Sequence, residues 1–151
     1  METEKIPLNI QLPSGETIYR EDLLEEVRIS EDLDSESRVI GARIVRYGYL
    51  ASYFSHQKRT LDDERKRYRA QFFLRAKGSS QVTWMEDGDV RSKTKPTEKE
   101  IEAAWRLDPE TQLIDGRLSD ADSSYELFTW LARAHQSKSA QITNLQRKHQ
   151  E

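Results

Sequence analysis

The sequence predicts a mainly α-helical protein. We expect a long antiparallel helical hairpin, coiled-coil-like, with a short helix and a small N-terminal β-hairpin or extended arm before it. Two observations predict this class. Hydrophobic residues make up only 35% of the 151 residues and charged residues 34%, a balance that favours long helices burying a narrow apolar stripe. Apolar residues also recur at steps of three and four along two long segments, which is the helical period.

Residues 1–20 predict the β arm. Apolar and polar residues alternate over seven positions, at Ile6, Leu8, Ile10 and Leu12. This is the period of a half-buried strand, and Pro13-Ser14-Gly15 marks a turn after it. Residues 21–151 are then expected to form one helical domain, which opens with a short acidic helix over 21–27.

The first long helix is expected to begin after Asp34 or Ser35. It is expected to be continuous because no proline interrupts residues 37–77, and to end before Gly78, which is a stop signal. Residues 78–96 are polar and rich in glycine, serine and charge, so they predict a loop. A connection of that length without structure of its own is usually functional or disordered.

A second helical stretch follows this loop. Thr97 and Glu100 have the spacing of a capping box, and Asp108-Pro109 predicts a further helix start with proline at its first position. The apolar stripe of the last helix is expected at Ile114, Leu118, Ala121, Tyr125, Phe128, Ala132, His135, Ser139, Ile142 and Leu145. Its seven-residue repeat is that of a coiled coil. Two long helices joined by a connector most naturally fold back on each other, and their remaining apolar residues favour oligomerisation.

Catalytic patterns are nearly absent, so we do not expect an enzyme, a cofactor or a metal site. There is no cysteine, which excludes disulfides and thiolate chemistry, and no glycine-rich phosphate loop or nucleophile elbow. The histidines are far apart, and we expect His135, on the apolar stripe, to be partly buried beside a hydrogen-bond partner. No apolar run is long enough to span a membrane, and no secretory pattern opens the chain. We therefore expect a cytoplasmic protein.

Charge is strongly segregated along the chain. Residues 1–36 carry a net charge of −8, whereas residues 58–77 carry +5. The basic segment has interleaved aromatic residues, a composition that suits single-stranded nucleic acid because cations follow the backbone and aromatic rings stack on bases. The candidate DNA-binding residues are Lys58, Arg59, Arg65, Lys66, Arg67, Arg69, Phe73, Arg75, Lys77, Lys93 and Lys95. The alternative is that these cations are simply solvated and that Tyr68 and Phe72 belong to the core.

This order of features resembles the UvsY-type recombination mediator family of tailed bacteriophages. The resemblance covers residues 20–148: the acidic helix at 21–27, the basic helix ending in the run 68–73, and the stretch from 95 to the final amphipathic helix. It implies a largely helical ring-forming protein that binds single-stranded DNA. It also implies that a RecA-like recombinase is loaded onto strands covered by single-strand-binding protein. The resemblance places the DNA contacts on Arg67 and Arg69, with Arg65 and Lys66 adjacent.

Three functions therefore remain open. The leading hypothesis is an oligomeric single-stranded-DNA-binding recombination mediator. The second is a non-enzymatic coiled-coil structural or assembly adaptor of a phage, in which the basic segment pairs with an acidic surface. A small regulator of duplex DNA is a weaker third, because no groove-reading motif is visible. Exposure of residues 58–77 in the assembly would discriminate between the first two.

Overall fold

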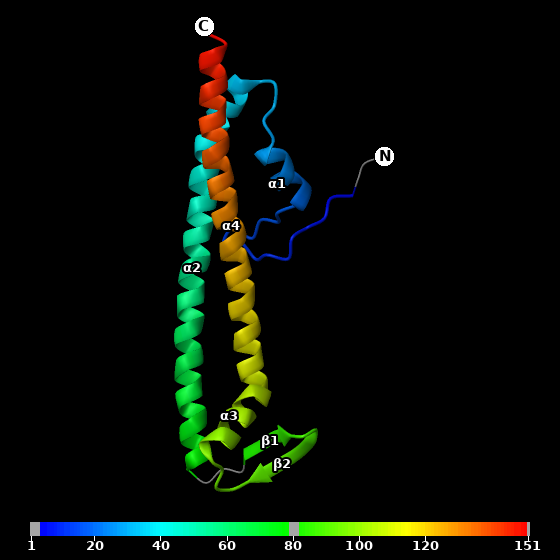
Figure 1. Cartoon of the computed structure of the whole chain (residues 1–151), viewed down its shortest axis with the longest axis vertical. Coiled ribbons are helices and arrows are strands. Elements are labelled where there is room, and N and C mark those ends of the chain that lie inside the picture. Colours follow the sequence, from blue (N-terminus) through cyan, green and yellow to red (C-terminus); the bar gives the residue numbers. More distant parts are fainter. Residues whose placement is uncertain (1–3, 79–81, 151) are drawn as a thin grey trace. The chain divides into compact units, whose positions relative to one another are not determined.

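The computed structural model describes residues 4–78 and 82–150 (Figure 1), and this part of the chain is mainly helical, as predicted. Its elements are α1 (Arg20–Val27), α2 (Leu33–Lys77), β1 (Val82–Glu86), β2 (Asp89–Lys93), α3 (Glu98–Leu107) and α4 (Pro109–Lys148). Helix α2 begins two or three residues before the predicted start, and near this start the Ser35 N–H donates to Asp32 Oδ1 over 3.0 Å. None of the described helices is long and apolar enough to cross a bilayer.

The chain divides into two compact units. The first comprises Met1–Phe54 and Ser123–Glu151, and the second comprises Ser55–Asp122. Each of the two long helices contributes one part to each unit, and these parts pack against each other within the unit.

The first unit has an aromatic core between α2 and α4. The ring of Phe128 stacks on Tyr47 and Phe54 with centroids 6.1 and 5.6 Å apart. Leu50 and Leu131 are buried in the same cluster. Helix α1 lies beside this helix pair (Figure 1).

The N-terminal segment covers this core as an extended arm. Its two limbs pair through single backbone bonds, in which the Leu8 N–H donates to the Ile18 carbonyl over 2.8 Å and the Arg20 N–H to the Ile6 carbonyl over 3.0 Å. Leu12 and Ile18 are buried against the helices. The alternating pattern therefore marks an arm that packs on its own helices, with an isolated bridge in place of a regular hairpin.

The buried face of α4 consists of two rows of residues. One row is as predicted, and the other is shifted by one position along the sequence. Ile114, Ala121, Phe128, His135 and Ile142 are buried, as expected from their seven-residue spacing. The second buried row, however, consists of Ser124, Leu131 and Lys138. It therefore lies one residue before the predicted Tyr125, Ala132 and Ser139. Leu118 and Tyr125 are half-buried.

The second unit is built around α3. Trp105 packs against Tyr68 and Phe72 of α2, with both ring-centroid distances at 5.5 Å. Ile101 and Ala104 of α3 bury Val82 and Trp84 of β1. These contacts assign Tyr68 and Phe72 to the core.

The helix starts in this unit follow the predicted chemistry. Thr97 and Glu100 form the capping box, in which the Thr97 N–H donates to Glu100 Oε2 over 2.7 Å and the Glu100 N–H donates to Thr97 Oγ1 over 3.4 Å. Asp108 caps α4 by accepting from the Thr111 N–H over 3.0 Å, and Pro109 is the first residue of that helix. Both predicted starts are confirmed.

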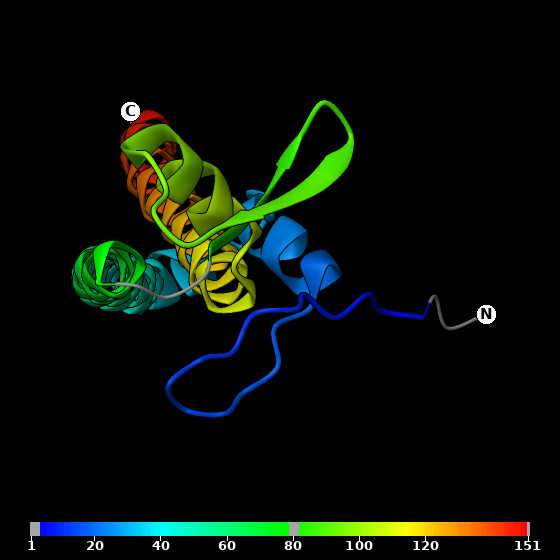
Figure 2. The ribbon, with the colours of Figure 1, turned by 90° about the horizontal axis from the view of Figure 1, so that it is seen from below.

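The prediction of a loop over 78–96 was wrong. Strands β1 and β2 form an antiparallel hairpin within it, with Glu86 opposite Asp89 at the turn. Figure 2 shows this hairpin extending from α3 with its turn at the free end. Asp87 and Gly88 both have positive φ, 51° and 83°, which matches the two-residue turn that Asp-Gly favours. Inward-facing Val82 and Trp84 hold the hairpin on α3.

Candidate nucleic-acid interface

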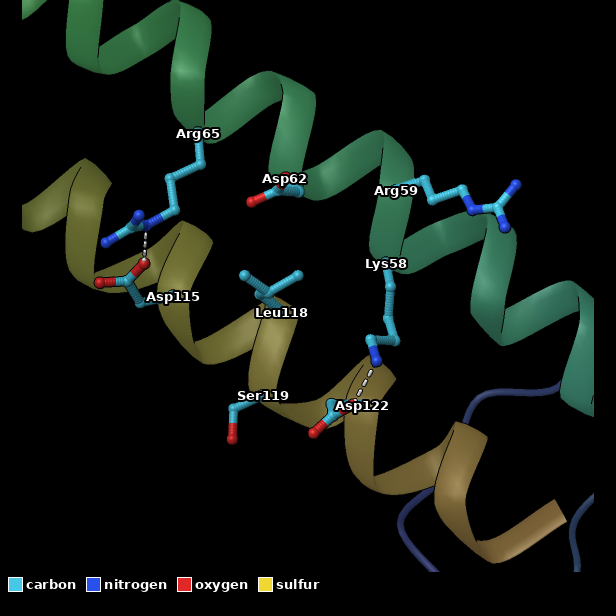
Figure 3. Close-up of a pocket in the computed structure, with 8 residues that line it drawn as sticks. All are labelled: Lys58, Arg59, Asp62, Arg65, Asp115, Leu118, Ser119 and Asp122. Carbon is cyan, nitrogen blue, oxygen red and sulfur yellow. Dashed lines mark hydrogen bonds and ion pairs between the residues drawn. The ribbon is translucent and has the colours of Figure 1, made fainter. Parts of the chain in front are cut away.

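The basic part of α2 faces acidic residues of the second unit. Lys58 Nζ lies 2.5 Å from Asp122 Oδ1, and Arg65 Nε lies 2.6 Å from Asp115 Oδ1. Figure 3 shows both pairs bridging α2 and α4. Their order, with the later residue of α2 meeting the earlier residue of α4, follows from the antiparallel run of the two helices in this unit.

A shallow groove of about 590 Å³ lies between these two ion pairs. Half-buried Leu118 lies between them. The lining contains three cations and three carboxylates, so it has no net charge. The residues that line the groove are Lys58, Arg59, Asp62, Arg65, Asp115, Leu118, Ser119 and Asp122. A groove of this composition does not by itself attract a polyanion.

Further cations of the predicted set are also paired. Arg69 Nη2 lies 2.6 Å from Glu102 Oε2 of α3, and Lys66 Nζ lies 2.8 Å from Asp62 one turn earlier in α2. Lys77 and Lys93 both reach the acidic first turn of α3. Their Nζ atoms lie 3.3 Å from Glu98 Oε1 and 3.7 Å from Glu100 Oε1, respectively. The acidic start of α3 therefore pairs with a lysine at the end of α2 and with a lysine of β2.

Four of the predicted cations have no carboxylate partner among the described residues: Arg59, Arg67, Arg75 and Lys95. All four are exposed. Arg59 points away from Asp122 in Figure 3. Arg67 Nε donates to the Asp63 carbonyl of its own helix over 3.4 Å, its single partner within residues 4–78 and 82–150. Arg75 lies over the Tyr68 ring, 5.8 Å from its centroid. These side chains present charge to solvent.

The aromatic residues of this segment are mostly engaged. The Tyr68 hydroxyl donates to Asp108 Oδ2 over 2.8 Å, and burial together with this bond raises the Tyr68 pKa. Phe73 is half-buried, and Arg69 covers its ring at 4.8 Å from the centroid. Phe73 is therefore a stacking surface only if Arg69 moves aside.

The second unit as a whole is electrically balanced. Residues 55–122 contain fourteen basic and fourteen acidic side chains. The excess of cations along residues 58–77 is offset mainly by acids that sequence order places far away, on α3 and α4. The positive charge of this surface is therefore carried by the four outward cations and not by a net excess of basic residues in the unit.

A buried polar cluster in the first unit escaped the sequence analysis. Lys138 is 3% exposed. Its ammonium pairs with the Glu36 carboxylate of α2 and donates to the Glu26 carbonyl of α1 over 2.7 Å. The Tyr47 hydroxyl donates to the Glu26 carboxylate. The Tyr47 pKa is raised mainly by burial and, to a smaller extent, by this bond. This cluster fastens α1 to both long helices.

His135 belongs to the same cluster and differs from its prediction. It is fully buried and stacks on Tyr47 with centroids 5.3 Å apart. Neither ring nitrogen has a hydrogen-bond partner among the described residues, although Nε2 lies 3.8 Å from Glu26 Oε2. Burial lowers the His135 pKa below its usual value of 6.5, and the Glu26 carboxylate opposes this only in part. His135 is therefore neutral at pH 7 and acts as a core aromatic ring.

Within residues 4–78 and 82–150, no three histidine or acidic side chains gather closely enough to hold a metal ion. In comparisons with known proteins, no family model, curated protein or solved structure matches the chain.

Proposed function

We propose that this protein is a non-enzymatic, single-stranded-DNA-binding mediator of homologous recombination. It acts in the cytoplasm of a bacterial host cell and helps load a RecA-like recombinase onto strands covered by single-strand-binding protein. The observation that supports DNA contact is that Arg59, Arg67 and Arg75 of α2 are exposed. None of the three has a carboxylate partner among the described residues. The resemblance noted from the sequence supports the recombination role.

The paired cations can join this surface at small cost. The side chains of Arg65 and Arg69 are 37% and 48% exposed, and ion pairs at such positions contribute about 0–1 kcal/mol. A DNA phosphate can therefore replace Asp115 or Glu102 as the partner. The displaced carboxylates then face the DNA, which limits the affinity of a single subunit.

Oligomerisation overcomes this limit. We propose that the long helices form a coiled-coil-like antiparallel hairpin and that several copies assemble into a ring. Linked weak sites bind far more tightly than one site, because each later contact is effectively intramolecular. Wrapping the strand around such a ring would loosen the single-strand-binding protein and expose a nucleation site for the recombinase.

A second candidate is a coiled-coil structural or assembly adaptor of a phage. The observation that favours it is the pairing of six predicted DNA-binding cations with acids of their own chain. In this account the charge segregation along the sequence serves folding. The absence of any DNA affinity would favour the adaptor.

The site assignment is tested by Arg67→Ala combined with Arg69→Ala. We expect weaker binding to a labelled oligo-dT strand. Each lost phosphate contact should also reduce the slope of log affinity against log salt by roughly 0.7. Fluorescence anisotropy over a salt series measures both quantities, and circular dichroism and light scattering check the helix content and the oligomer size.

The matched control is Arg117→Ala combined with Arg133→Ala, which removes the same charge from exposed positions of α4. This control should bind nearly as the unmodified protein does. Equal affinity and equal salt slope in the two double variants would contradict the placement of DNA on α2.

A further inference from the structure

The outer edge of β2 leaves the backbone N–H and C=O of Val90 without a hydrogen-bond partner among the described residues. The type I′ turn at Asp87-Gly88 joins Glu86 and Asp89 by its own hydrogen bond. Because hydrogen-bonded and non-hydrogen-bonded pairs alternate in an antiparallel ladder, Met85 and Val90 form a non-hydrogen-bonded pair. The N–H and C=O of Val90 therefore point away from β1. No other described segment pairs with β2, whose five residues are all exposed.

The side chains of the hairpin favour pairing at this edge. Val90 is 73% exposed and Met85 is 51% exposed, and the two share the face that points away from α3. On the other face, Asp89 stands directly opposite Glu86, and like charges placed so are unfavourable. Arg91 Nε lies 3.5 Å from Glu86 Oε2, whereas Asp89 has no cation partner among the described residues.

The β2 sequence is complementary to itself when two copies run antiparallel. With Val90 opposite Val90 of the second copy, Asp89 stands opposite Arg91 of that copy, and Arg91 opposite its Asp89. In this register the N–H and C=O of each Val90 form hydrogen bonds with those of Val90 in the other copy. Each Asp89 also gains the cationic partner that it lacks among the described residues of its own chain. It also places two apolar side chains together, a favourable cross-strand pair.

We propose that two copies of this chain associate through their β2 edges in this register, forming a continuous four-stranded antiparallel sheet across a two-fold axis. The contact is isologous, so it joins copies in pairs. It does not depend on DNA binding, and its test needs no DNA. A strand of another protein at the same edge is the competing occupant.

Proximity of the two strands is tested by Val90→Cys in the full chain, which otherwise contains no cysteine. Facing residues of a hydrogen-bonded pair have Cα atoms about 5.5 Å apart, a separation that a disulfide spans. Under mild oxidation we expect cross-linked dimers to form at least about tenfold faster than for Val45→Cys, since pre-association raises the effective thiol concentration. Val45 is a matched control because it is 72% exposed. Equal rates would overturn the proposal, including the case in which another protein occupies the edge.

The register is tested by adding a charge reversal to Val90→Cys. Asp89→Arg places two arginine–arginine pairs across the contact, and Arg91→Asp places two aspartate–aspartate pairs there. Each variant alone should cross-link more slowly than Val90→Cys, whereas an equimolar mixture should recover the rate as heterodimers, because both cross-strand pairs are then complementary. A mixture that cross-links no faster than the separate variants would overturn the register. Recovery on mixing also shows that both variants remain folded.

Discussion

Replacing Lys138 with alanine is expected to lower the free energy of unfolding by about 3–5 kcal/mol, because removing one partner leaves the other charge buried. The Glu36 carboxylate would lose its ammonium partner in a site where its own side chain is 15% exposed. The Arg43 guanidinium, 3.7 Å from Glu36, would remain as the nearest cation. The Glu26 carbonyl would also lose a donor, so α1 should loosen first. Urea unfolding followed by circular dichroism measures the loss.

At position 138, the contributions of charge and of side-chain volume to the free energy of unfolding can be measured separately. Lys138→Met keeps most of the aliphatic stem and removes the charge, and it should destabilise nearly as much as alanine. Lys138→Met combined with Glu36→Gln removes both charges and should recover a large part of the loss. A loss below about 1 kcal/mol in Lys138→Met would place this pair among ordinary surface ion pairs and contradict the account of the cluster.

Replacing Phe128 with alanine is expected to cost about 3–5 kcal/mol of unfolding free energy, the range for deleting a fully buried phenylalanine side chain. Phe128 is fully buried and stacks on Tyr47 and Phe54 from α2. The cavity would therefore open in the middle of the first unit, where neighbouring rings cannot easily collapse into it.

The control for this prediction is Phe128→Leu, which leaves a smaller cavity and should cost clearly less. Unfolding in urea gives both values, and an unchanged denaturant slope would show that the comparison concerns stability alone. Equal losses for alanine and leucine, or a loss near zero for alanine, would contradict the assignment of Phe128 to the centre of the core.

The long helices could be predicted because their signals are local and repeated. The seven-residue spacing of Ile114, Ala121 and Phe128 can be recognised without knowledge of the partner helix. The second buried row of α4 was predicted one position too late because the prediction rested on hydrophobicity. On that criterion Tyr125 is a better core residue than Ser124, and Ser139 a better one than Lys138. Lys138 is buried because Glu36 and the Glu26 carbonyl meet it, and that contact depends on the antiparallel register.

The hairpin was missed for a different reason. Its strands are five residues long and carry mixed charge, so alternation is weak there, although Asp87-Gly88 is a strong hairpin turn signal. The burial of Val82 and Trp84 depends on α3, which sequence alone does not place beside them.

The candidate interface could be predicted as a set of residues but not as a surface. The cations of 58–77 are evident in the sequence. Their neutralisation depends on Asp115 and Asp122, which lie about fifty residues or more further along the chain and meet α2 only after folding. Sequence reasoning therefore overstated the net positive charge of this region.

The most direct test of the proposed function is fluorescence anisotropy of the full-length protein with a labelled oligo-dT strand and a matched duplex. The titrations are run at roughly 50 and 200 mM salt, a range over which phosphate contacts weaken markedly, with light scattering on the same samples. We expect an oligomer that prefers the single strand and loses affinity steeply with salt. A folded oligomer that binds neither DNA at the lower salt concentration would contradict the mediator proposal and support the structural adaptor.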